Sequence, residues 1–190
     1  MKIPKQAKCV FKGVIFDIYH WQQKMFNGSL ATFEAIKRCS SVRVIAIQNN
    51  KIILNKEKQP GSKEVLGTFG GQINKNETPL QCAKRELLEE SGLESKDWEL
   101  LYKKEQYPEK MDFIVYVYVA RNCKKIKKPK LDPGEKIKNI EVSFNEFVRI
   151  MLDKNSHHVV KELVMDILRM KVEGKLKKLK NKLFTQKNSH

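Results

Sequence analysis

Four glutamates lie close together in a chain that is otherwise strongly basic. The 190-residue sequence carries 38 Lys and Arg against 22 Asp and Glu, and its formal net charge is +16. Within 14 residues, however, it gathers Glu77, Glu86, Glu89 and Glu90. Neighbouring carboxylates repel one another unless a cation or an arginine neutralises them. Clustered carboxylate oxygens are ligands that Mg²⁺ and Mn²⁺ prefer, so the cluster indicates a site for a divalent metal ion.

A helix over residues 79–91 would bring three of these glutamates to one side. At about 100° per residue, Glu86, Glu89 and Glu90 share one arc of that helix, beside an apolar stripe formed by Leu80, Ala83 and Leu87. Taken alone, the same run also fits a solvated acidic helix face, so the spacing of the neighbouring residues has to decide between the two interpretations.

Two features next to the carboxylates favour chemistry. Arg85 is adjacent to Glu86 and four residues before Glu89, so it can orient a carboxylate through charge-assisted hydrogen bonds. Gly70 and Gly71 allow the preceding loop to approach closely, because glycine has no side chain. A backbone carbonyl at Gly70 could then complete the coordination of a metal ion.

Both ends of the helix carry clear signals. Thr78 is a suitable N-cap, Pro79 suits the first helical position, and Gln81 completes a capping box. Gly92 supplies the residue that commonly ends a helix in the left-handed conformation.

The remaining segments predict a sheet with interspersed helices, which is the α+β (mixed α/β) class. Strands are expected at 9–26 (as one or two), 41–48, 51–55, 65–71, 97–106, 111–121 and 137–142. The segment 29–38 fits a strand or a helix, and loops are expected at 56–64 and 122–136. Helices are expected at 143–152 and, as one long basic amphipathic helix, at 157–184, where the apolar stripe is Val172, Leu176, Leu179 and Leu183.

Composition indicates one domain over residues 1–152, followed by a basic helical segment over 153–190. Four cysteines without a CxxC pair argue against a disulfide framework or a zinc site and favour a reducing, cytoplasmic location. No apolar run is long enough for a membrane span. The basic balance favours anionic partners such as nucleotides or nucleic acid, although a solvated lysine surface would explain it equally well.

The complete spacing resembles one family. Gly71, five residues, Glu77, seven residues and then RELLEESGL, from Arg85 to Leu93, match the Nudix box over 70–93 at every position. The chain is therefore identified as similar to Nudix hydrolases. The resemblance implies a mixed β-sheet sandwiched between helices, with the box as a loop–helix–loop. It also implies hydrolysis of a nucleoside diphosphate linked to another moiety, with Mg²⁺ or Mn²⁺.

The resemblance also implies roles for the site residues. Glu89 and Glu90 resemble metal ligands, Glu86 resembles a further ligand or the catalytic base, and Arg85 would orient it. The supporting residues would be Glu77, Gly71 and Gly92. A later loop, LDPGEKI at 131–137, resembles one that supplies another catalytic acid, and Glu135 is the candidate, although a surface turn would also explain it.

Outside the box, residues 10–150 resemble ADP-ribose and ADP-sugar pyrophosphatases, which dimerise through N-terminal strands, here within 1–40. Pro108 lies sixteen residues past Gly92, as in that group, whereas Gly67 and Phe69 stand where its members commonly have Glu and Pro. The substrate-binding candidates are Arg43, Lys58, Phe69 and Pro108. The alternatives are a hydrolase of dinucleoside polyphosphates, suggested by Tyr107, a hydrolase of RNA 5′ ends, suggested by the basic loop and tail, and a non-catalytic nucleotide sensor.

Overall fold

The computed structural model describes residues 2–131, 133–134, 136–153 and 161–185. Its centre is a six-stranded mixed sheet with the strand order β12-β5-β4-β10-β8, and β6 pairs with β5. The strands are β4 (Ser41–Gln48), β5 (Lys51–Lys58), β6 (Val65–Gly67), β8 (Asp97–Glu105), β10 (Ile114–Arg121) and β12 (Lys136–Val142). β4 and β10 run parallel, and the other pairs are antiparallel. The predicted α+β class is confirmed.

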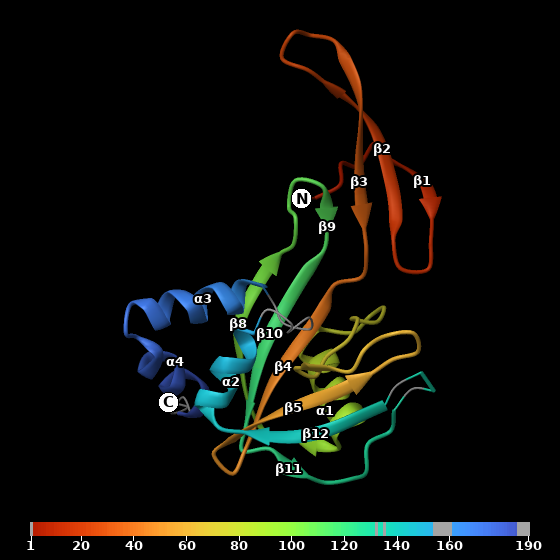
Figure 1. The fold of residues 1–190 in the computed structure, drawn as a ribbon. Helices are drawn as coiled ribbons and strands as arrows, with labels where there is room; N and C mark the ends of the chain where they lie inside the picture. Colours follow the sequence, from red (N-terminus) through yellow and green to blue (C-terminus); the bar gives the residue numbers. More distant parts are fainter. Residues whose placement is uncertain (1, 132, 135, 154–160, 186–190) are drawn as a thin grey trace.

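Helices cover both faces of this sheet (Figure 1). α1 (Pro79–Ser91) lies on one face, and α2 (Phe144–Met151), α3 (Lys161–Val172) and α4 (Leu176–Phe184) lie on the other. Alternate residues of β4 point into the two cores: Val42 and Val44 pack with α1, whereas Ile45 and Ile47 pack with the other helices. A strand buried on both faces needs apolar residues throughout, which explains the sequence of β4.

The N-terminal region forms a second sheet that projects from the domain (Figure 1). Its order is β1-β2-β3-β9, with β1 (Lys8–Lys12), β2 (Asp17–Lys24), β3 (Leu30–Lys37) and β9 (Met111–Asp112). We call β1–β3 the N-terminal arm. The expected strand region 9–26 is thus two strands, and the ambiguous segment 29–38 is a strand.

The signals at the ends of α1 are confirmed. The backbone N–H of Gln81 donates to Thr78 Oγ1 at 3.3 Å, and the backbone N–H of Thr78 donates to Gln81 Oε1 at 2.8 Å. Gly92 ends the helix with a φ of 69°. The chain then forms β7 (Leu93–Glu94), which pairs with β11 (Lys124–Lys125) inside the region expected as a basic loop.

Several expected boundaries differ from the structure. β5 continues to Lys58, because β6 and β12 both extend its hydrogen bonding beyond residue 55. The segment 111–121 divides between β9 and β10, which pair in different sheets.

The long C-terminal helix is two helices, because Gly174 adopts a left-handed φ of 68° between α3 and α4. Leu179 and Leu183 of the predicted stripe are buried in the core, whereas Val172 is 81% exposed. The amphipathic α4 therefore packs on the domain. Among the described residues, no helix is long and apolar enough to cross a bilayer.

Arg121 connects α4 to the sheet. It is only 2% exposed, and its Nη1 and Nη2 lie 3.2 Å from Asp97 and 2.6 Å from Glu99. The same guanidinium donates to the backbone carbonyls of Lys182 at 2.6 Å and Leu183 at 2.8 Å. One buried side chain thus forms ion pairs with two carboxylates of β8 and donates to carbonyls in the last turn of α4.

We expect Arg121→Met to lower the free energy of unfolding by about 3–5 kcal/mol, because it leaves two carboxylates without their buried partner. Denaturant unfolding followed by circular dichroism measures this loss. Arg169→Met is the matched control, since Arg169 is 68% exposed at its contact with Asp166 and should contribute about 1 kcal/mol or less. Equal effects of the two changes would contradict the proposed role of Arg121.

The four cysteines divide into two classes. Cys9 and Cys39 are exposed and free, whereas Cys82 and Cys123 are buried and free. Burial raises the pKa of Cys82 to about 12 and that of Cys123 to about 11. Both buried thiols therefore stay protonated near pH 8. Because the thiolate is the reactive form, we expect them to react slowly.

In the native protein at pH 8, we therefore expect Cys9 and Cys39 to react rapidly with Ellman's reagent, and Cys82 and Cys123 to react slowly. In denaturant all four should react rapidly. Rapid reaction of the buried pair without denaturant would show that α1 or the end of β10 opens readily.

Candidate active site

A cavity of about 630 Å³ opens where β4 and β5 diverge. These strands pair only over Ala46–Gln48 and Lys51–Ile53, and beyond that point β5 pairs with β6. β4 bonds instead to the loop before α1, through Val44 N to Phe69 O at 2.8 Å and Val42 N to Gly71 O at 3.0 Å. The cavity is lined by Arg43, Glu57, Gln59, Gly70, Gly71, Gln72, Asn74, Arg85, Glu86, Glu89, Glu90 and Lys130.

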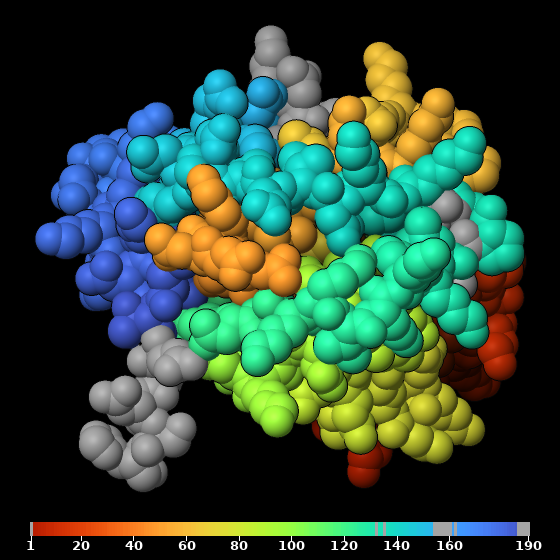
Figure 2. Space-filling view, turned by 90° about the horizontal axis from the view of Figure 1, so that it is seen from below, coloured from red at the N-terminus to blue at the C-terminus, as the bar shows by residue number. Residues whose placement is uncertain are grey.

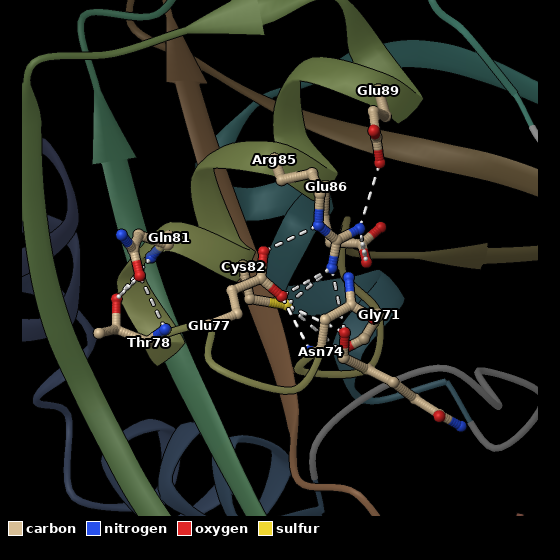
Figure 3. A network of polar contacts seen from close by, with 10 residues as sticks. Gly71, Asn74, Glu77, Thr78, Gln81, Cys82, Arg85, Glu86 and Glu89 are labelled. Atoms are coloured by element: carbon tan, nitrogen blue, oxygen red, sulfur yellow. Dashed lines mark hydrogen bonds and ion pairs between the residues drawn. The ribbon is translucent and has the colours of Figure 1, made fainter.

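Arg85 is the centre of a polar network on the cavity wall (Figure 3). Its Nε and Nη2 donate to the two oxygens of Glu77 at 2.8 and 3.1 Å, which is a bidentate contact. Its Nη1 donates to Glu86 Oε1 at 2.7 Å and to Glu89 Oε2 at 3.2 Å. Its Nη2 also donates to the carbonyl of Gln72 at 3.1 Å. The guanidinium thus joins the loop before α1 to two consecutive turns of the helix.

This network changes the protonation equilibria of its members. Hydrogen bonds from Arg85 hold the pKa of Glu77 below its usual value, and partial burial opposes that shift. Hydrogen bonding to Glu77 raises the pKa of Arg85 further above its ordinary value. Glu77 therefore remains a carboxylate near neutral pH and uses both oxygens on Arg85, which fits the supporting role expected for it.

Two glycines make room for the carboxylates. A side chain at Gly71 would collide with the carboxylate of Glu86. Gly70 has a φ of 147°, and a side chain there would collide with the carbonyl of Val42. The backbone N–H of Gly70 donates to Glu90 Oε2 at 3.2 Å, so the loop holds a carboxylate of the helix directly.

Glu86, Glu89 and Glu90 all line the cavity, as their spacing predicted. Within the described residues, no group of three or more His, Cys, Asp or Glu side chains is close enough to form a metal site, and Arg85 contacts Glu86 and Glu89 instead. The chemistry of the lining nevertheless fits a divalent metal ion. The cavity lining contains four carboxylates and only three cationic side chains, so its net charge is negative. A phosphate substrate is also negative, and it would be repelled unless metal cations bind in the cavity.

Arg43 of β4 lines this cavity, and its role in substrate binding stays a prediction. Its Nη1 donates to the carbonyl oxygen of Gly70 at 3.5 Å. The guanidinium of Arg43 therefore contacts the same oxygen that was predicted to bind a metal ion. Burial lowers the pKa of Arg43, and the negative charges of Glu90, Glu57 and Glu86 oppose that shift.

The other substrate-binding candidates lie elsewhere. Phe69 is fully buried in the core beneath α1, so its ring is a packing group, and that prediction is wrong for its side chain. Pro108 is exposed in the β8–β9 connection and does not line the cavity. Lys58 lines a different, smaller cavity. Glu135, the candidate further acid, lies outside the described residues.

Sequence reasoning missed five lining residues that carry charge or hydrogen bonds: Glu57, Gln59, Gln72, Asn74 and Lys130. Glu57 lies on the same face of β5 as the buried Ile53. Side chains alternate between the two faces of a strand, so counting in steps of two from Ile53 would have placed Glu57 on the face that α1 covers. Gln59 Nε2 donates to Glu57 Oε1 at 2.7 Å. Lys130 is placed by a tertiary contact, from its backbone N–H to the carbonyl of Glu89 at 2.8 Å, which no local pattern signals.

The basic segment 122–131 follows β10 and packs against the end of α1 (Figure 2, teal). The backbone N–H groups of Ile126 and Lys127 donate to the carbonyl of Gly92 at 3.0 and 3.4 Å, and Lys125 Nζ donates to the carbonyl of Ser91. Gly92 itself has no space for a side chain, because the carbonyl of Lys127 is too close. The ammonium group of Lys125 therefore lies at the carbonyl end of the helix, where positive charge is stabilised.

Comparison with known proteins agrees with this geometry. The NUDIX domain model matches residues 37–163, which is more than half of the chain. The methanol dehydrogenase activator of Bacillus methanolicus is 30% identical over 148 residues, covering 76% of this chain and 80% of that protein. The ADP-ribose pyrophosphatase of Bacillus subtilis is 26% identical over 165 residues, covering 85% and 89%.

A solved structure supports the fold. The crystal structure of an ADP compounds hydrolase superposes with a TM-score of 0.71 at 18% identity, covering 90% of this chain and 95% of that one. The box over 70–93 forms the expected loop–helix–loop, and its helical carboxylates Glu86, Glu89 and Glu90 line one cavity. Together with the matched domain model, these observations show that the chain belongs to the Nudix family of pyrophosphate hydrolases.

Proposed function

We propose that the protein is a Mg²⁺-dependent pyrophosphohydrolase that cleaves ADP-ribose or a related nucleotide sugar into a nucleoside monophosphate and a sugar phosphate. The observation that carries this proposal is the single cavity in which Glu86, Glu89 and Glu90 face Arg43. The similarity to an ADP-ribose pyrophosphatase over 85% of the chain supports the substrate class. Mn²⁺ is the alternative metal, since both ions prefer oxygen ligands.

The reaction is a hydrolysis that needs no other reactant. The oxygen of a water molecule forms a bond to one phosphorus of the pyrophosphate, and the bond from that phosphorus to the bridging oxygen breaks. The bridging oxygen leaves with the other phosphate, and the proton lost by the water passes to a base, for which Glu86 is our candidate. A bound divalent ion would lower the pKa of water and offset the negative charge of the phosphates.

The protein's own residues divide the remaining tasks. Glu89 and Glu90 would hold the metal ion, with the backbone of Gly70 beside them. Arg85 positions Glu86 and Glu89 through the contacts described above. Arg43 is placed to bind the phosphates, because its half-buried guanidinium lines the cavity and suits the bidentate recognition of phosphate oxygens.

Glu89→Gln tests the metal-binding role. Glu89 is 40% exposed, so we expect the variant to fold normally. Its kcat with ADP-ribose and Mg²⁺ should fall by about 100-fold or more, because loss of a ligand or base charge at the reacting centre has effects of this size. Product analysis by chromatography measures AMP release, and circular dichroism checks the fold.

Glu94→Gln is the matched control, since Glu94 is an exposed glutamate four residues beyond the helical glutamates and outside the cavity. This variant should retain wild-type kcat. If wild type releases no nucleoside monophosphate from any nucleotide sugar, the proposed substrate class is wrong. If Glu89→Gln keeps full activity, the assigned role of that residue is wrong.

The N-terminal arm supports a second proposal, that two copies of the chain associate through it. Its two turns carry apolar side chains that are fully exposed: Val14 is 104% exposed and Phe26 is 111% exposed. Phe11, Ile15 and Leu30 are each at least 50% exposed. These side chains lie at both ends of β2, and exposed apolar surface of this kind commonly marks an interaction site. A separate observation supports the proposed cytoplasmic location: all four cysteines are free, as is usual for proteins of a reducing compartment.

We expect the wild-type protein to have the mass of a dimer in multi-angle light scattering. The double variant Val14→Asp, Phe26→Asp should have the mass of a monomer, because four buried carboxylates would oppose association. Val172→Asp is the control, since Val172 is 81% exposed in α3 and outside the arm. A monomeric wild type, or a double variant that remains dimeric, would contradict the proposal.

A further inference from the structure

One carboxylate of the catalytic cavity does not belong to α1. Glu57 comes from β5, and only 8% of it is exposed. Gln59 Nε2 donates to its Oε1 at 2.7 Å, and Asn55 Nδ2 donates to its Oε2 at 3.4 Å. Within the part of the chain that the structure describes, Glu57 forms no ion pair. A negative charge is therefore buried in the cavity wall with neutral amides as its hydrogen-bond donors.

The burial of this charge is unfavourable for folding. A carboxylate loses its hydration when it is buried, and two neutral amides replace only part of the lost free energy. Glutamine has the same shape and would avoid this cost. Proteins break such rules mainly at functional sites, where the group serves a ligand. The charge of Glu57 therefore indicates that a ligand in the cavity uses it.

The two amides orient the carboxylate and leave part of its hydrogen-bonding capacity for a ligand. Each oxygen of an ionised carboxylate can accept two hydrogen bonds, so each oxygen of Glu57 retains an acceptor position. Gln59 also lines the cavity, and its amide keeps a second N–H and a carbonyl oxygen. Hydroxyl groups both donate and accept, so they match this arrangement. A phosphate only accepts and is itself negative, so it does not.

Arg43 places this acceptor next to the expected position of the phosphates. Burial lowers the pKa of Arg43, and the charges of Glu90 and Glu57 are the two largest that oppose this shift. Glu57 is therefore near the guanidinium, although the two side chains form no ion pair. A substrate whose phosphates contact Arg43 brings the group attached to those phosphates close to Glu57.

We propose that Glu57, oriented by Gln59 and Asn55, accepts hydrogen bonds from the hydroxyl groups of the sugar linked to the nucleoside diphosphate and excludes substrates that carry a phosphate there. This inference rests on the proposed hydrolase function and makes its substrate class narrower: the linked moiety is an uncharged sugar. Hydroxyl groups form strong, charge-assisted hydrogen bonds with a carboxylate. A phosphate in the same place would be repelled, because water screens a buried charge poorly.

The test compares ADP-ribose with ATP, which share the ADP half and differ in the group linked to it. With Mg²⁺, wild type should have the higher kcat/KM for ADP-ribose. In Glu57→Gln the ratio of kcat/KM for ADP-ribose to that for ATP should fall about tenfold or more, the effect of losing a hydrogen bond to a charged group. Glu64→Gln is the matched control, since Glu64 is 49% exposed at its contact with Lys56 and lies outside the cavity. It should leave the ratio within about twofold, because solvent screens an exposed charge.

Two further measurements distinguish sugar binding from a structural role and from metal binding. The melting temperature of Glu57→Gln should equal or exceed that of wild type, because the variant removes a buried charge that has no ion pair. Its affinity for Mn²⁺ in calorimetric titration should be unchanged, since the proposed partner of Glu57 is the sugar. A lower melting temperature or a weaker affinity for Mn²⁺ would contradict the inference.

Three kinetic results would overturn the inference while leaving hydrolysis of ADP-ribose, and so the proposed function, intact. They are a wild type that prefers ATP, an unchanged ratio in Glu57→Gln, and an equal fall of the ratio in Glu57→Gln and Glu64→Gln. If wild type hydrolyses neither substrate, the proposed function fails instead. Calorimetric titration with the two nucleotides then decides the inference. Tighter binding of ADP-ribose than of ATP, weakened in Glu57→Gln and preserved in Glu64→Gln, supports it, and any other result contradicts it.

Discussion

The bidentate contact between Arg85 and Glu77 is the interaction on which the rest of the site depends. It fixes the guanidinium at 2.8 and 3.1 Å from a carboxylate of the loop, and the remaining N–H groups then reach Glu86 and Glu89 on the helix. Without this cation, three carboxylates would repel one another on a short stretch of chain. Because Glu77 uses both of its oxygens on Arg85, it positions the site, while the carboxylates that line the cavity come from α1 and from Glu57 of β5.

The Arg85–Glu77 contact requires the loop before α1 to lie close to the helix. Hydrogen bonds between this loop and β4 hold it there. β4 bonds to the loop at Phe69 and Gly71 where it diverges from β5. The divergence opens the cavity, and the glycines at 70 and 71 let the backbone pass between Val42 and Glu86. The left-handed Gly92 then turns the chain, so that the later basic segment can return and bond to the last turn of α1. Backbone geometry, more than side-chain packing, therefore defines the site.

Features of local origin could be predicted from the sequence. The capping box of Thr78 and Gln81, the stop at Gly92 and the arc of Glu86, Glu89 and Glu90 depend on residues within one turn of each other. Tertiary features were harder to predict. Lys130 reaches the cavity through a backbone contact 41 positions from its partner Glu89, and Phe69 is buried because of how its segment pairs with β4. The break at Gly174 was missed because the lysines and leucines around it continue the helical pattern.

The charges that line the catalytic cavity explain how a basic protein can use an acidic site. Long-range attraction for a polyanion comes from the net charge of +16. At short range, however, the catalytic cavity holds four carboxylates and three cationic side chains, so it opposes a phosphate until further positive charge enters. Divalent ions can supply that charge for the two phosphates being separated.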